Sequence, residues 1–101
     1  MSVIVIVRFP VSDVAKAVDG LRAQAALLEE MTKANKKGGN LGHRVGAGDG
    51  ELVIVDEWET VEQFQGFYAD NANVEHISAE LGVTGPPAIL VLASVDSPGT
   101  F

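Results

Sequence analysis

The spacing of apolar positions changes along the chain, and each change predicts a new element. Residues 2–9 are rich in valine and isoleucine. They are followed by Pro10, which has no backbone N–H to donate to a strand ladder. They predict a central strand. From Ser12, the expected N-cap, apolar residues recur every three or four positions, at Val14, Val18, Leu21, Ala25 and Leu28. This period predicts one long amphipathic helix, which Gly38 and Gly39 close.

Two short segments, Asn40–Ala47 and Glu51–Trp58, lie on either side of the sequence GAGDGE. The Asp49-Gly50 pair inside it is a strong signal for a tight hairpin. The two segments are therefore predicted to be antiparallel neighbours in one sheet.

Helical spacing returns after this hairpin. Thr60 and Gln63 have the spacing of a capping box, which predicts the start of a helix. The inward face of that helix would carry three aromatic residues, Phe64, Phe67 and Tyr68. The sequence DNAN at residues 70–73 interrupts it. A second helical stretch follows, with one apolar face made by Val74, Ile77 and Leu81. Gly82 ends this stretch, and residues 88–95 are predicted to form a last strand before an irregular tail.

The predicted order is β-α-β-β-α-β, the split βαβ arrangement of ferredoxin-like domains. The fold class is therefore α+β, with one antiparallel four-stranded sheet that carries its helices on a single face. A chain of 101 residues, 47% of them hydrophobic, has the size of one globular domain, and we expect residues 1–101 to form it.

The other face of the sheet has no predicted cover. Successive residues of a strand point to opposite faces, and the residues predicted for both faces are apolar. In the first strand, Val5 and Val7 belong to one face, and Ile4 and Ile6 belong to the other. Such a face would expose an apolar patch that monomers rarely tolerate. The pattern therefore predicts a homodimer formed through the open sheet face.

Charge and composition exclude several kinds of partner. The formal net charge is −7, all seven Lys and Arg lie between Arg8 and Arg44, and ten of the fourteen acids lie from Asp49 onward. This balance argues against nucleic acid or an anionic membrane as a partner. The chain has no cysteine, so disulfides and thiolate sites are excluded, and a cytoplasmic location is expected. The apolar start is too short to span a bilayer.

Candidate chemistry gathers around Trp58, the only tryptophan. If Asp49 and Gly50 form a two-residue turn, His43 lies opposite Asp56 and Leu41 opposite Trp58, all on one face of the sheet. A four-residue loop keeps them on one face with shifted pairing. A three-residue loop with a bulge moves His43 to the other face from Asp56.

These residue types suit acid–base chemistry on an aromatic ligand. A histidine beside Asp56 can act as a general base, because the carboxylate fixes the imidazole tautomer and raises its basicity. Trp58 could supply a flat apolar wall for an aromatic molecule. Two alternatives stay open: Trp58 as a core or dimer contact, and His43 as a structural or surface hydrogen-bonding residue.

Other polar residues offer weaker candidates. His76 falls on the flank of the second helical stretch, where it could border a pocket mouth. Arg8 could hold an anionic or phenolate oxygen, or pair with one of the many acids at the surface. The acidic run from Asp56 to Glu62 is not expected to bind a metal, because adjacent residues on a strand point to opposite faces. GAGDGE lacks the last glycine of the dinucleotide-binding pattern and links two strands.

Two stretches, VDEWETVEQFQGFYADN and ELGVTGPPAILVLASV, carry a family resemblance. Together with the element order, they resemble the dimeric α/β-barrel superfamily, most closely its antibiotic-biosynthesis-monooxygenase-like branch. The resemblance implies a homodimer with a pocket in each protomer between sheet and helices. It also implies oxygenase chemistry without a cofactor, in which a deprotonated phenol or quinol gives an electron to dioxygen. Many members carry a histidine on the helix soon after the tryptophan, where this chain has Phe67 and Tyr68. The first strand also lacks the asparagine of the haem-degrading branch.

Two functions follow from the residues and the resemblance together. The first is a cofactor-independent oxygenase-like enzyme for a small aromatic molecule, with no metal. Its expected catalytic residues are His43, His76 and Tyr68, and its expected substrate-binding residues are Trp58, Arg8, Asp56, Phe64 and Phe67. The second is a non-catalytic ligand-binding or stress-associated dimer of the same fold, in which Trp58 and the aromatic cluster are core.

Overall fold

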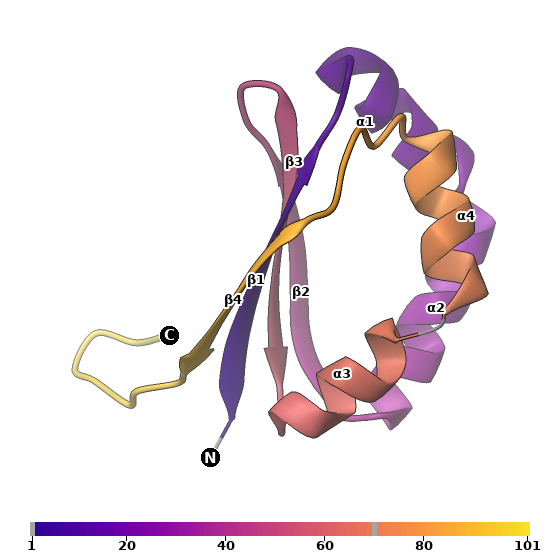
Figure 1. The fold of residues 1–101 in the computed structure, drawn as a ribbon. Helices are drawn as coiled ribbons and strands as arrows, with labels where there is room; N and C mark the ends of the chain where they lie inside the picture. Colours follow the sequence, from indigo (N-terminus) through magenta and orange to yellow (C-terminus); the bar gives the residue numbers. More distant parts are fainter. Residues whose placement is uncertain (1, 70) are drawn as a thin grey trace.

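A computed structural model describes residues 2–69 and 71–101. Within these ranges four strands form one antiparallel sheet in the order β2-β3-β1-β4: β1 Val3–Pro10, β2 Asn40–Ala47, β3 Glu51–Trp58 and β4 Ala88–Ala93. The described helices are α1 Val14–Ala23, α2 Ala25–Lys37, α3 Val61–Tyr68 and α4 Ala72–Glu80. All four helices lie on one side of the sheet, which leaves the other face open (Figure 1). The predicted α+β ferredoxin-like architecture is confirmed.

The central strand β1 divides its side chains between the two faces. Val5, Val7 and Phe9 are buried beneath the helices. Ile4 and Ile6 alternate with them and therefore point to the open face. Directly opposite residues on paired strands point to the same face. The residues of β3 and β4 opposite Val5 and Val7 therefore point to the helix side, and those opposite Ile4 and Ile6 point to the open face.

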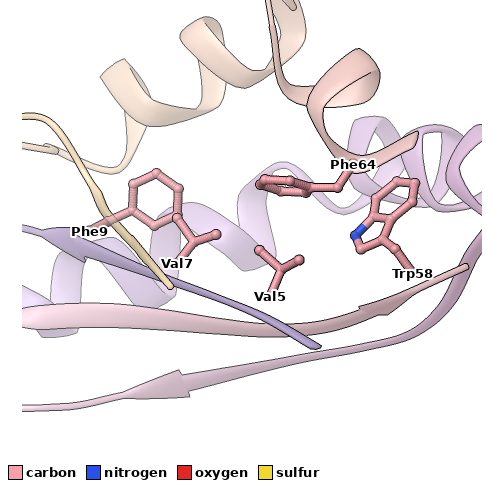
Figure 2. Close-up of a cluster of buried hydrophobic side chains, with 5 residues drawn as sticks. All are labelled: Val5, Val7, Phe9, Trp58 and Phe64. Atoms are coloured by element: carbon pink, nitrogen blue, oxygen red, sulfur yellow. The ribbon is translucent and has the colours of Figure 1, made fainter. Parts of the chain in front are cut away.

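The larger core cluster lies between the sheet and α3. Its buried members are Val5, Val7, Phe9, Trp58 and Phe64 (Figure 2). The Trp58 ring packs edge-on against Phe64, with centroids 6.0 Å apart, and stacks on Phe67 at 5.6 Å. Aromatic pairs in these geometries are favourable beyond the area that they bury. Trp58 is thus a central packing residue, only 1% exposed.

The long helix predicted from Ser12 to Gly38 is divided at Gln24, where φ is −97° and ψ is 19°. The Gln24 N–H is shared between the carbonyls of Gly20 and Leu21, a pattern common at helix ends. The predicted N-cap is also wrong by one residue. Asp13 caps α1, since its carboxylate accepts from the Lys16 N–H at 3.1 Å, while the Ser12 N–H donates to the Gly82 carbonyl.

The remaining helix signals are confirmed with small shifts. Thr60 and Gln63 form the predicted capping box at the start of α3. The last strand ends at Ala93 and not at residue 95, although the Ser94 N–H still donates to the Ser2 carbonyl. Asp70, the first residue of the predicted DNAN interruption, lies outside the described residues. Within the described ranges, no helix is both long and apolar enough to cross a membrane.

Candidate functional site

A cavity of about 750 Å³ lies between the sheet and the helices. Strands β1, β2 and β3 and all four helices contribute to its walls, most of which are apolar. Helix α2 has no buried residue, and the apolar side chains of Leu28 and Met31 line the cavity. A volume of this size suits a small organic ligand.

The hairpin places His43 on the wall of this cavity. The Gly48 N–H donates to the Glu51 carbonyl at 2.9 Å, which leaves Asp49 and Gly50 as a two-residue turn. Gly50 has a φ of 70°, the left-handed conformation that such turns require. In this register His43 lies opposite Asp56, as the two-residue turn predicts.

The predicted pairing of Leu41 with Trp58 is wrong. The register shifts between Asn40 and Gly42, so that Asn40 is the residue opposite Trp58. Leu41 is the extra residue of this irregularity, and such a residue stays unpaired in the ladder. Asn40 therefore takes the position opposite Trp58 that the sequence predicted for Leu41, while Leu41 still lines the cavity.

His43 and Asp56 form a close pair, with Nδ1 and Oδ1 2.6 Å apart. The second carboxylate oxygen accepts a hydrogen bond from the Trp58 Nε1–H at 3.3 Å. Asp56 is only 6% exposed, and both of its oxygens have a partner, as a buried carboxylate requires.

The hydrogen bond that Asp56 accepts from the ring raises the pKa of His43 above its usual 6.5, although partial burial of the ring opposes this shift. When Nδ1–H donates to the carboxylate, Nε2 is the nitrogen that can accept a proton. Since both His43 and Asp56 line the cavity, a ligand hydroxyl there could lose its proton to this pair.

Three aromatic side chains of α3, those of Phe64, Phe67 and Tyr68, line the same cavity. Partial burial raises the pKa of the Tyr68 phenol, so that its hydroxyl stays protonated and able to donate at neutral pH. Trp58 does not reach the cavity. It lies behind Phe67, so its position matches the core alternative and not the predicted ligand wall.

Arg8 and His76 stand apart from this group. Arg8 lies on the open face and makes a two-point ion pair with Glu51, at 2.7 Å from Nε and 2.8 Å from Nη2. It is thus the surface partner of an acid and cannot share a ligand with His43 across the sheet. His76 is exposed on α4 and does not line the cavity. In the described part of the chain, no group of three or more His, Cys, Asp or Glu side chains could hold a metal ion.

Sequence reasoning missed Asn40 and the cavity face of α2. Asn40 lines the cavity, and so do Thr32 and Asn35 of α2. The apolar period of α2 was visible in the sequence. It predicted an amphipathic helix, but periodicity marks only the inward face of a helix and does not tell whether that face packs in a core or lines a cavity.

No protein-family model matches the chain, and no curated protein matches it. Solved structures do. A monooxygenase from the gene ActVA-Orf6 of Streptomyces coelicolor, in complex with nanaomycin D, is 20% identical with a TM-score of 0.71, over 95% of this chain and 89% of that one. SnoaB, a cofactor-independent oxygenase from Streptomyces nogalater, is 16% identical with a TM-score of 0.65, over 98% of both chains.

A dimeric ferredoxin-like protein from an uncultured marine organism is 10% identical with a TM-score of 0.67, over 95% of this chain and 90% of that one. At such low identities the comparison speaks for the fold. The chain therefore has the ferredoxin-like fold of antibiotic biosynthesis monooxygenases, as its resemblance to that branch predicted.

Proposed function

We propose that this protein is a cofactor-independent, monooxygenase-like enzyme that acts on a small aromatic molecule such as a phenol, a quinol or a polyketide-type compound. The observation that carries the proposal is the His43–Asp56 pair on the wall of a largely apolar cavity of about 750 Å³. An apolar cavity with a histidine base on its wall suits an aromatic ligand that carries an ionisable hydroxyl. The shared fold with SnoaB and the ActVA-Orf6 monooxygenase supports this reaction class by analogy.

In the proposed reaction, His43 Nε2 takes the proton of the substrate hydroxyl, and Asp56 stabilises the imidazolium that forms. The electron-rich phenolate then gives an electron to dioxygen, and the substrate itself is the reductant. For oxidation of a ring methylene to a carbonyl, one oxygen atom enters the substrate and the other leaves with the two methylene hydrogens as water. Tyr68, protonated at neutral pH, could donate a hydrogen bond to a substrate oxygen.

Substrate-dependent oxygen uptake tests this proposal. His43→Gln removes the base, so we expect turnover of an anthrone or quinol to fall by about 10²- to 10⁴-fold. His76→Gln is the matched control, because His76 is exposed on α4 and outside the cavity, and its rate should equal that of the unaltered protein. A folded protein that consumes no oxygen with any quinol or anthrone would overturn the enzymatic proposal.

A second candidate function is a non-catalytic ligand-binding protein of the same fold. The burial of Trp58 in the core favours it, because a tryptophan expected to face the ligand serves packing instead. In that case, replacement of both histidines by glutamine leaves ligand affinity nearly unchanged and oxygen uptake absent. Calorimetric titration of the double variant alongside the uptake assay separates the two functions.

We also propose that two copies associate through the open sheet face. This face carries Ile4 and Ile6 together with Val55, Leu90 and Leu92, and the last three are 42%, 52% and 42% exposed. Large exposed apolar patches mark interaction surfaces. The dimeric ferredoxin-like protein of the same fold supports a homodimer.

A further inference from the structure

The floor of the cavity is polar at one end and apolar over the rest of its length. It consists of three rows of side chains, because opposite residues on paired strands lie beside one another. The rows are His43 with Asp56, then Val45 with Ile54 and Val7, and last Leu52 with Phe9. Successive rows are two residues apart along each strand, so the floor measures roughly 14 Å from the first row to the last.

Aromatic side chains of α3 form the roof at the polar end. The ring centroids of Phe64 and Phe67 lie 6.0 Å and 5.6 Å from that of Trp58. Trp58 follows Asp56 by two residues on β3, on the side away from the apolar rows. Figure 2 shows Phe64 beside Trp58 and Phe9 at the other end of the cluster. An aromatic ring bound at the polar row can therefore contact other aromatic rings.

The other end of the cavity is aliphatic. Leu52 belongs there to a small buried cluster, and three residues that line the cavity pack against this cluster: Leu21, Leu81 and Val83. Beyond the polar row, the lining residues in the described part of the chain are aliphatic except for Phe9, Ser78 and the polar residues of α2. Aliphatic side chains offer no π-face for stacking, and the burial that they provide is non-directional and proportional to apolar area.

A single phenol ring cannot fill this space. One ring covers less than half of a floor of roughly 14 Å, and the whole cavity measures about 750 Å³. A short ligand would leave the aliphatic end without partner atoms, so its lining would lose dispersion contacts. A flexible alkyl chain on the ring would reach this end and bury one methylene after another against aliphatic walls.

We propose that the ligand of this cavity is an aromatic molecule with one ring hydroxyl and a long alkyl side chain. The ring lies between the aromatic residues of α3 and His43, and the chain follows the apolar rows toward Leu52 and Leu21. This inference rests on the proposed function for the hydroxyl at His43. It narrows the substrate class from small aromatic molecules in general to alkyl-substituted phenols and quinols, and it excludes large fused-ring compounds.

A series of 4-alkylphenols, from 4-ethylphenol to 4-octylphenol, tests the proposal. Isothermal titration calorimetry measures their affinities without turnover. Each added methylene should tighten binding by roughly two- to fourfold, because it adds apolar surface that becomes buried. A fused-ring phenol of the same size, 2-hydroxyanthracene, has as many carbon and oxygen atoms as 4-octylphenol and should bind more weakly than it does.

Two variants locate the chain within the cavity. Leu21→Trp fills the aliphatic end, so it should weaken binding of 4-octylphenol by about tenfold or more and leave that of 4-ethylphenol unchanged. Val45→Trp obstructs the middle row and should have the same effect. Val45 is 44% exposed on an edge strand, so this variant tests the inference even if Leu21→Trp fails to fold. Ala26→Trp is the control, because Ala26 is exposed on α2 outside the cavity.

Three results would overturn the inference: affinities that do not rise with chain length, an equal loss for short and long phenols in the variants, or tighter binding of 2-hydroxyanthracene. Oxygen uptake with a short alkylquinol tests the proposed function separately. Uptake without an effect of chain length would leave the enzymatic proposal standing and overturn this inference alone. An effect of chain length without uptake would support this inference and overturn the enzymatic proposal.

Discussion

Asp56 raises the pKa of His43, and the Trp58 Nε1–H donates a hydrogen bond that orients the Asp56 carboxylate. The carboxylate is buried, accepts from both side chains and faces the cavity, so its charge acts on the imidazole with little water between them. The Trp58 Nε1–H holds the carboxylate from the core side. The tryptophan thereby contributes to the site through Asp56, without contact to the cavity.

This arrangement predicts the pH dependence of the site. The base form of His43 exists above its pKa, which Asp56 raises above 6.5, so turnover should increase with pH through that raised value. Asp56→Asn removes the charge, and the pKa of His43 should fall back toward 6.5. NMR titration of the imidazole carbons measures this pKa directly, even without a substrate. An unchanged midpoint for His43 in this variant would contradict the role assigned to the pair.

At the scale of elements, the sequence predicts the turns and helix starts that short local motifs determine. The Asp49-Gly50 turn fixed the register that joins His43 to Asp56, and the Thr60–Gln63 box fixed the start of α3. The irregularity at Leu41 and the break at Gln24 could not be predicted, because no residue type marks them and they depend on how the elements pack.

The burial of Trp58 was one of two open alternatives for the same reason. A strand residue beneath a helix can face either a core or a cavity, and the position of the helix decides which. The sequence left the face of Trp58 open, because it allowed a contact between copies as well as a core position. The structure places Trp58 in the core on the helix side of the sheet.

Gly39 joins three elements at one point: the end of α2, the start of β2 and the cap of α3. Its φ is 107°, and an added Cβ would collide with the Gln63 side chain, which caps α3. We expect Gly39→Ala to lower the free energy of unfolding by about 1–3 kcal/mol, from backbone strain together with a disturbed cap. Urea unfolding followed by circular dichroism measures the change.

Gly66→Ala provides the matched control within α3. A Cβ at Gly66 meets no atom within 4 Å, and the position is helical, so this change should stabilise the protein by about 0.5–1 kcal/mol. If Gly39→Ala were neutral while Gly66→Ala behaved as expected, the capping junction would not be the constraint described above.

At the scale of the whole molecule, one face of the sheet is covered by helices and the other is apolar and exposed. Strand β4 lies at the edge of the sheet, and its neighbouring residues point to opposite faces. Leu90 pairs with Ile6 on the open face and is 52% exposed, while Ile89 pairs with buried Val7 on the helix side and is 44% exposed. The two side chains point to opposite faces of the sheet but are exposed to a similar extent.

These two positions make a sharp test of the proposed dimer. Leu90→Lys places a charge in the proposed interface, so it should convert the dimer into a monomer at concentrations where the unaltered protein is dimeric. Ile89→Lys introduces the same charge one residue away on the other face, and this variant should stay dimeric. Light scattering coupled to size exclusion measures the masses. If both variants dissociate, or neither does, the contact between copies does not lie on the open sheet face, and a monomeric unaltered protein would exclude the dimer altogether.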